Sequence, residues 1–241
     1  MEVKILAGGS SGNCIAVNYG KKVILVDAGI AKTKIEKRLL DEGIHPNDIT
    51  SIFITHAHSD HVKGLPFANK YKIPVFATKG EWELIDNVDS DLKRVVFPYE
   101  NNISVTSFPT HHDSNESVGY ALHGDLKVSI CLDTGHVDKE MLNVMRDSDI
   151  YVIEANHEPR MVEFSNYPNS VKARILSDIG HLSNQQTANV LYELVQGKKE
   201  KIYVTHLSKS NNFPKLAKMT VENRLKEKGL INGIDYFLEV V

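Results

Sequence analysis

The sequence contains only two cysteines and a single tryptophan, and it has no long apolar run. Cys14 and Cys131 are too few for a disulfide framework, and no Cys-x-x-Cys pair indicates a zinc knuckle. No run of about 18 apolar residues is present, and the first residues lack the charged start and apolar core of a secretion signal. We therefore expect a cytoplasmic protein that has no membrane partner.

Internal repeats, low-complexity tracts and Pro/Gly-rich linkers are absent as well. The 241 residues are 41% hydrophobic and 24% charged, which is typical of a globular protein. Because nothing in the chain marks a boundary between domains, we predict a single domain over residues 1–241.

The formal charge of the chain is -3, but it is unevenly distributed. Residues 198–228 contain nine Lys and Arg against three Asp and Glu, so this segment carries +6 and the remainder carries -9. A basic segment can bind a polyanion, because contacts to phosphate supply most of the sequence-independent affinity for nucleic acids. The alternative is the solvated face of an amphipathic helix, and both interpretations stay open.

Short runs rich in β-branched residues alternate with helical patterns along the chain. The runs predict ten strands, at residues 3–6, 14–18, 23–26, 51–55, 75–77, 103–108, 118–123, 128–132, 150–153 and 202–205. The helical patterns cover residues 31–42, 62–71, 79–87, 139–146, a longer stretch through Arg174, 184–195 and 214–228. This order predicts an α/β fold in which two mixed sheets are flanked by outer helices.

The segment IFITHAHSDHVKGL places three histidines and an aspartate directly after a predicted strand. His56 and His58 are two residues apart and can project to the same side. Asp60 and His61 follow and face a second point, so that one loop can hold two metals. Imidazoles suit Zn, Mn or Fe, and the carboxylate adds tolerance for harder cations.

Further candidate ligands follow other predicted strands. His111 and His112 come after residues 103–108, Asp133 comes after residues 128–132, and His206 comes after residues 202–205. One histidine at a strand end is more often a satisfied surface residue. The repetition of this pattern, together with the histidine-rich loop, predicts a metal site with two ions.

Polar loops supply candidate substrate contacts. The segment GGSSGN lacks the ending of a nucleotide-binding P-loop, but Ser10, Ser11 and Asn13 can contact phosphate; a plain tight turn is the alternative. Asn211 and Asn212, after His206, are candidates of the same kind, although such pairs often only satisfy turns.

The motif His56-Ala-His58-Ser-Asp60-His61, preceded by LVDAG and followed by His112, Asp133 and His206, resembles the metallo-β-lactamase superfamily. The resemblance implies a four-layer αβ/βα sandwich. It also implies seven metal ligands in two sets that share one aspartate: His56, His58 and His112 for one metal, Asp60, His61 and His206 for the other, and Asp133 for both. In that family the residue at Asp27 holds the histidine loop by hydrogen bonds. We expect the same kind of support from Glu154.

The remaining motifs narrow the branch of the superfamily. Lactamases commonly have cysteine where this chain has Asp133, and neither a large inserted cap domain nor a helical C-terminal substrate domain is evident. The segments ILAGGSSGNC, THHDSNESVGYAL, IEANHE, GHLSN and THLSKSNN resemble the YycJ/WalJ group, whose members are regarded as phosphodiesterases acting on DNA. That comparison favours His112 over His111 as the ligand.

The resemblance implies a dinuclear-metal-dependent phosphodiesterase, specifically an exonuclease-like nuclease that acts on DNA through a metal-bridging hydroxide. Asp60 would orient or deprotonate the nucleophile, and His181, at a predicted helix start, would protonate the leaving oxygen. A small phosphodiester or thioester hydrolase of glyoxalase II-like chemistry is the enzymatic alternative. A nucleic-acid-binding protein with a purely structural metal is a third possibility, which the carboxylate ligands disfavour.

Overall fold

The computed structural model describes residues 1–9, 11–96 and 104–241. The described residues form two compact units. The first comprises Met1–Pro98 and Ser114–Val118, and the second comprises Tyr99–Asp113 and Gly119–Val241. The expectation of a single domain stays a prediction. In the described part of the chain, no helix has both the length and the apolar character needed to span a membrane.

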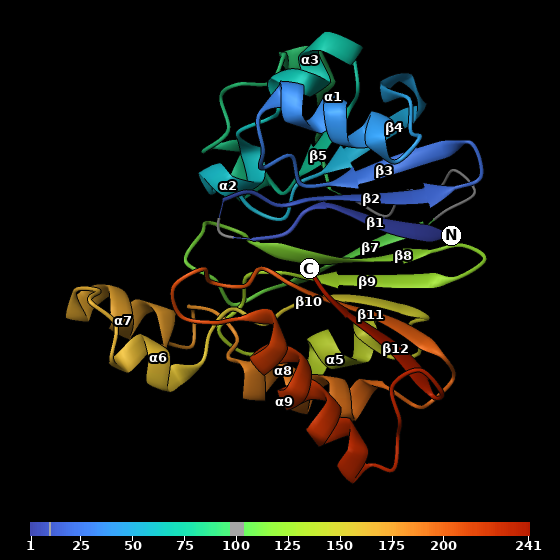
Figure 1. Ribbon diagram of the computed structural model, residues 1–241. Helices are drawn as coiled ribbons and strands as arrows, with labels where there is room; N and C mark the ends of the chain where they lie inside the picture. Colours follow the sequence, from blue (N-terminus) through green and yellow to red (C-terminus); the bar gives the residue numbers. More distant parts are fainter. Residues whose placement is uncertain (10, 97–103) are drawn as a thin grey trace. The chain divides into compact units, whose positions relative to one another are not determined.

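The first unit contains a six-stranded mixed sheet (Figure 1). In spatial order its strands are β1 (Glu2–Ala7), β2 (Cys14–Tyr19), β3 (Lys22–Val26), β4 (Ile49–Phe53), β5 (Val75–Ala77) and β6 (Lys93–Val95). The first three strands are antiparallel, and β3 to β6 are parallel. The parallel strands end at the same edge, so the loops that follow them gather there.

The helices of the first unit are α1 (Lys32–Asp41), α2 (Ser59–Val62), α3 (Pro66–Tyr71) and α4 (Lys79–Trp82), with 3-10 turns η1 (Pro46–Asp48) and η2 (Ser90–Leu92). Helix α1 buries Ile35 and Leu39 in the apolar core of this unit. The predicted helix 62–71 is instead divided, because Pro66 starts a new helix where its missing N–H is not needed. The predicted helix 79–87 ends at Trp82, and buried Ile85 lies in an irregular segment.

The second unit contains another six-stranded mixed sheet. Its strands are β7 (Ser104–Pro109), β8 (Val118–His123), β9 (Lys127–Cys131), β10 (Ile150–Glu154), β11 (Glu200–Thr205) and β12 (Tyr236–Val240), in the order β12-β11-β10-β9-β8-β7. Strands β9 to β12 are parallel. The prediction of ten strands was wrong in omitting β6 and β12. Both lie at sheet edges and expose side chains such as Val95, Phe237 and Glu239, which breaks the buried β-branched pattern.

The helices of the second unit are α5 (Lys139–Met145), α6 (Pro159–Glu163), α7 (Asn169–Ile175), α8 (Asn184–Leu194) and α9 (Pro214–Glu227). Helices α5, α8 and α9 contribute to the core on one face of the sheet, whereas α6 and α7 lie beyond the strand ends (Figure 1). The stretch predicted to be helical through Arg174 is interrupted, because Pro168 precedes α7 and disfavours continuation of α6. Helix α8 begins with a capping box between Ser183 and Gln186.

His157 lies between β10 and the start of α8 and is 1% exposed. Its carbonyl accepts a hydrogen bond of 2.9 Å from the Asn184 N–H, and it bridges Ser183. Burial lowers the pKa of His157 to about 4, because the charged imidazolium would lose its hydration. The folded protein therefore holds this ring in its neutral form.

We expect His157 to make the fold acid-sensitive. Its pKa lies below the unfolded value, so the unfolded chain binds the extra proton and stability is lost as the pH falls from about 6.5 toward about 4. Between pH 7.5 and pH 4.5 the loss due to this group is roughly 2–3 kcal/mol. Urea unfolding with chelator present should show a smaller loss for His157→Gln than for the wild type. His45→Gln, at an exposed histidine, is the control, and equal losses in all three proteins would contradict the assignment.

Candidate metal centre

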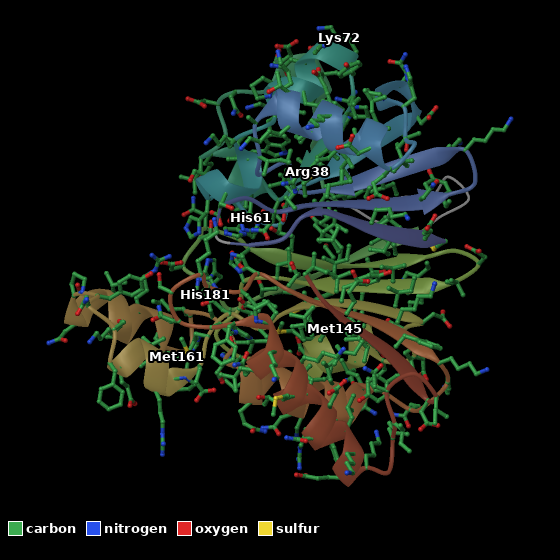
Figure 2. All side chains as sticks on the ribbon, viewed as in Figure 1. Arg38, His61, Lys72, Met145, Met161 and His181 are labelled. Atoms are coloured by element: carbon green, nitrogen blue, oxygen red, sulfur yellow. The ribbon has the colours of Figure 1, made fainter. Side chains whose placement is uncertain are left out.

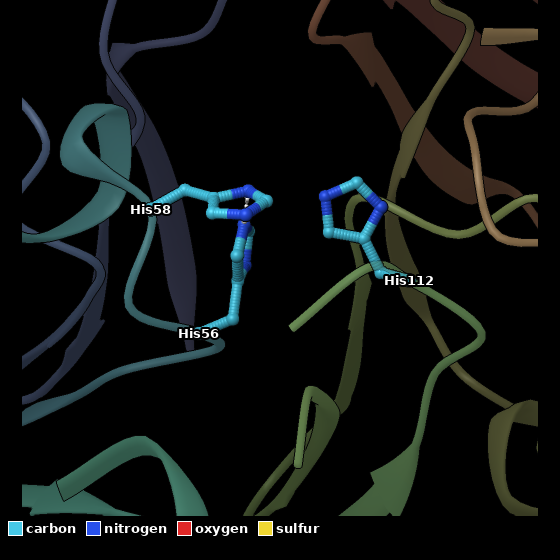
Figure 3. A group of neighbouring side chains, drawn as sticks. All are labelled: His56, His58 and His112. Atoms are coloured by element: carbon cyan, nitrogen blue, oxygen red, sulfur yellow. Dashed lines mark hydrogen bonds between the residues drawn. The ribbon is translucent and has the colours of Figure 1, made fainter. Parts of the chain in front are cut away.

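The histidine-rich loop follows β4 in the first unit and runs into helix α2. His56 is 1% exposed, whereas His58 is partly exposed. His56 Nε2 and His58 Nδ1 are 3.0 Å apart, as the dashed line in Figure 3 shows. Two nitrogens bound to one tetrahedral zinc at ordinary bond lengths are about 3.4 Å apart. The geometry of this pair is therefore close to that of two ligands sharing one ion.

His61, labelled in Figure 2, is completely buried and contacts a buried carboxylate. Its Nδ1 lies 2.7 Å from Asp27 Oδ2, and the other Asp27 oxygen accepts a bond of 2.8 Å from the Thr55 N–H. His61 Nε2 faces Asp60 Oδ2 at 3.7 Å. These contacts support the predicted role of Asp27, because they fix the orientation of the imidazole and direct its Nε2 toward Asp60.

The N-terminal loop packs closely behind the histidine loop. The Asn13 N–H donates to Asp60 O at 2.8 Å, and the Gly29 N–H donates to Asn13 O at 2.7 Å. A Cβ at Gly29 would lie 1.6 Å from Asp60 O, so only glycine permits this approach.

The residues of GGSSGN that were predicted to contact substrate fall in different environments. Asn13 is buried, and its Nδ2 lies 3.1 Å from His61 Nε2 while Gly9 donates to its Oδ1. Ser11 is exposed, and Ser10 lies outside the described residues. Asn13 thus contacts a proposed ligand, and its role toward substrate stays a prediction.

In the second unit, His112 lies on the loop after β7 (drawn in Figure 3) and its side chain is 1% exposed. Its Nδ1 donates to Gly180 O at 3.0 Å, and its Nε2 lies 3.3 Å from Asp113 Oδ1 and 3.9 Å from Asp133 Oδ2. Burial lowers the pKa of His112, which favours the neutral, metal-binding form.

The neighbouring His111 has a different environment. Its side chain is about one-third exposed, its Nε2 lies 2.7 Å from Asp138 Oδ2, and its ring stacks on His136 at 3.8 Å. Because His111 is engaged away from Asp133 while His112 approaches it, the geometry favours His112 as the ligand.

Four acidic and imidazole side chains of the second unit gather at the ends of parallel strands: Asp133, Glu154, His181 and His206, whose potential ligand atoms all lie within 4.8 Å of one another. His206 Nδ1 is 2.5 Å from Asp133 Oδ1 and 3.3 Å from Glu154 Oε2. His181, labelled in Figure 2, places its Nδ1 3.1 Å from Glu154 Oε2. This cluster could hold a divalent cation.

Glu154 is fully buried, and its two carboxylate oxygens have different partners: Oε2 lies near His181 and His206, as given above. Its Oε1 accepts from the N–H groups of Thr134 at 2.7 Å and Leu182 at 3.2 Å. Burial raises the pKa of its carboxyl, but His181 and the bonds to His181 and His206 outweigh burial and hold that pKa at about 2. Burial opposes protonation of His181, yet the same carboxylate raises the pKa of the imidazole.

Three of the candidate residues have a left-handed backbone. The φ angles are 62° at Asp27, 43° at Asp133 and 58° at His206. Non-glycine residues seldom adopt this region, although it also occurs in this chain at Lys72, Asp147 and Lys199; at functional sites the surrounding structure can enforce it. The backbone, and not only the rotamer, therefore aims these side chains.

Asn211 and Asn212 follow His206 but are buried, at 1% and 6% exposure. Asn212 and Asn184 exchange amide hydrogen bonds of 3.0 and 2.8 Å, and Asn212 also donates to Ala155 O. These contacts join the loop after β11 to the start of α8. Neither amide is presented at the surface, and their predicted contact with substrate stays a prediction.

Sequence reasoning missed Glu81, which is fully buried at the start of α4. Its carboxylate accepts a bond of 2.7 Å from the N–H of Ala57, which lies between His56 and His58. In the sequence, Glu81 stands three residues after Thr78, which is the ordinary position of a capping residue, so no signal distinguished it.

The donor set fits bound metal. Four imidazoles have Nδ1 engaged by a protein oxygen: His56 by Thr55 Oγ1, His61 by Asp27, His112 by Gly180 O and His206 by Asp133. Metal-ligating histidines typically use one ring nitrogen in this way, because it fixes the tautomer and orients the other nitrogen toward the ion. In each of the four, Nε2 is the nitrogen suited to a ligand.

Comparisons with known proteins agree with this chemistry. A family model described as the metallo-beta-lactamase superfamily matches residues 7–206. The exodeoxyribonuclease YycJ of Bacillus anthracis is 37% identical over 95% of this chain and 90% of its own length. The exodeoxyribonuclease WalJ of Streptococcus pneumoniae serotype 2 (strain D39) is 37% identical over 96% of this chain and 91% of its own length.

A solved structure, the metallo-beta-lactamase fold protein YhfI from Bacillus subtilis, matches with a TM-score of 0.73 at 14% identity, covering 99% of this chain and 95% of YhfI. The predicted fold class, the four-layer αβ/βα sandwich, is confirmed by this likeness and by the family match. The protein is thus a YycJ/WalJ-like member of the metallo-beta-lactamase superfamily.

Proposed function

We propose that this protein is a metal-dependent exonuclease that hydrolyses phosphodiester bonds of DNA in the cytoplasm. The observation that carries the proposal is the set of buried, pre-oriented imidazoles and carboxylates at the strand ends of both units. The relatives that share most of the chain's length carry the name exodeoxyribonuclease, which supports DNA as the substrate.

The proposal assigns two divalent ions, Zn or Mn, with Fe as a further option, to seven side chains in two sets that share one aspartate. The sets are His56, His58 and His112; Asp60, His61 and His206; and Asp133 in both. When bound, two such ions supply charge stabilisation to a phosphoryl group and activate a water molecule. The protein contributes the fixed orientation of the imidazoles, which the contacts of Asp27 and Glu154 support.

Asp60 is proposed to orient the attacking water and accept its proton. Its side chain is 26% exposed, whereas the neighbouring His61 has no exposed surface, so one carboxylate oxygen can reach the reacting water. His181 is proposed to donate a proton to the leaving oxygen. Its side chain is 17% exposed and Glu154 Oε2 fixes its Nδ1, which stabilises the protonated ring and leaves Nε2 for the leaving group.

The first test is metal-dependent digestion of end-labelled DNA. Protein loaded with Mn²⁺ or Zn²⁺ should release mononucleotides from linear DNA and leave covalently closed circular DNA intact, and chelation should abolish release. Asp60→Ala should lower kcat by about 10³-fold or more, because it removes a ligand and the proton acceptor. Asp86→Asn, at an exposed position, serves as the control. Cleavage only of bis-p-nitrophenyl phosphate or a thioester would contradict the proposal and favour a small-substrate hydrolase.

The role of His181 predicts a dependence on the leaving group. His181→Ala should lower kcat on DNA by about 10²–10⁴-fold with little change in KM, because the departing alkoxide needs a proton. On a p-nitrophenyl phosphodiester the loss should be tenfold or less, since that leaving group departs without one. An equal loss on both substrates would show that His181 is not the proton donor.

A further inference from the structure

We infer that Glu81 is a positioning residue of the metal centre, acting through the backbone of the histidine loop. The expected effect of Glu81 on metal affinity rests on the proposed function. Glu81 is fully buried and lies in helix α4, outside the seven proposed ligands. Burying a carboxylate costs free energy unless both of its oxygens accept hydrogen bonds. The hydrogen-bond partners of Glu81 therefore indicate its role.

One oxygen of Glu81 connects two segments. Oε2 accepts from the Ala57 N–H at 2.7 Å and from the Ser114 hydroxyl at 2.8 Å. Ala57 stands between His56 and His58, and Ser114 is two residues after His112. The same carboxylate oxygen therefore binds the backbone between His56 and His58 and a side chain two residues after His112.

The other oxygen of Glu81 accepts from the Glu116 N–H at 2.7 Å. Glu116 in turn accepts from the Gly80 N–H at 2.8 Å through its own carboxylate, and its carbonyl accepts from the Thr78 hydroxyl at 2.9 Å. The start of α4 and residues 114–116 thus exchange hydrogen bonds in both directions.

This exchange explains why residues Ser114–Val118 belong to the first unit although the chain on both sides of them belongs to the second. The Val118 N–H also donates to Thr55 O at 3.0 Å, next to His56. The short segment is therefore bonded at both ends to residues of the histidine loop or to the glutamate that holds it. Asp113 directly precedes the segment and His112 precedes Asp113, so the position of the segment limits where His112 can lie.

The consequence is a metal affinity that depends on Glu81. Residues that orient ligands without touching the metal typically change affinity 10–100-fold when altered. Replacement by glutamine keeps the size of the side chain but puts an NH₂ group in place of one oxygen that accepts a hydrogen bond from an N–H or O–H donor. The amide keeps one acceptor oxygen, so either the Glu116 N–H loses its acceptor or the Ala57 N–H and the Ser114 hydroxyl lose theirs. In both cases Glu81 no longer joins the loop of His56 and His58 to the whole of segment 114–116.

The experiment compares Glu81→Gln with Glu83→Gln, the same change at an exposed position next to the same helix. Zn²⁺ affinity, measured by competition with a chromophoric chelator, should fall 10–100-fold for Glu81→Gln and less than twofold for Glu83→Gln. Without metal, amide hydrogen exchange should accelerate at residues 56–58 and 114–116 in Glu81→Gln and stay unchanged in β10 and β11.

Two results would overturn the inference. One is wild-type Zn²⁺ affinity and wild-type exchange in Glu81→Gln. The other is a general loss of protection across the first unit with unchanged affinity, which would mark a purely structural role. If Glu81→Gln does not fold, Ser114→Ala removes one of the three bonds, and unchanged affinity and exchange there would overturn it equally. If the wild type binds no Zn²⁺, the proposed function fails, while the exchange comparison still decides the role of Glu81.

Discussion

Three carboxylates without exposed surface, Asp27, Glu81 and Glu154, hold the loops on which the metal centre depends. Asp27 fixes the ring of His61, Glu81 fixes the backbone between His56 and His58, and Glu154 contacts His181 and His206. Each of these carboxylates accepts hydrogen bonds from protein donors, which offset the cost of removing it from bulk water. The same hydrogen bonds therefore stabilise the buried carboxylates and hold the imidazoles in one orientation.

The supporting carboxylates and most of the candidate ligands lie on different kinds of structural element. The carboxylates stand at or near strand ends or at a helix start, whereas most of the candidate ligands lie on loops. Left-handed φ angles at Asp27, Asp133 and His206 show that the backbone itself is held in a seldom-used conformation. A site built in this way is oriented before an ion binds, so less order has to be imposed on binding.

The part of the fold that could be predicted is the part in which burial repeats along the chain. Strand β10 is buried throughout and β3 after its first residue, and both show as β-branched runs. Residues that follow other such strands, including His56 after β4, Asp133 after β9 and His206 after β11, could be assigned to strand ends. Edge strands β6 and β12 were missed because solvent permits charged residues there. The division of residues 62–71 at Pro66 depended on where one helix stops, which periodicity does not specify.

The supporting residues were harder to predict, because their function depends on contacts far along the chain. Glu81 resembles an ordinary capping residue in sequence, yet its partners are 24 to 35 positions away. Asn13 and Asn212 resemble exposed turn residues, but their side-chain amides form hydrogen bonds with His61 and Asn184 inside the protein. A polar side chain in a loop motif indicates that hydrogen bonds are made, but the sequence does not identify the residues that are its partners.

The proposed function requires that ligands drawn from both units hold one pair of metal ions. Anomalous diffraction from crystals of the Zn²⁺- or Mn²⁺-loaded protein tests it most directly. If the proposed ligand sets are correct, two peaks should lie about 3.5–4 Å apart, with Asp133 contacting both, His56, His58 and His112 at one, and Asp60, His61 and His206 at the other. A single peak, or separate ions held by one unit each, would contradict it.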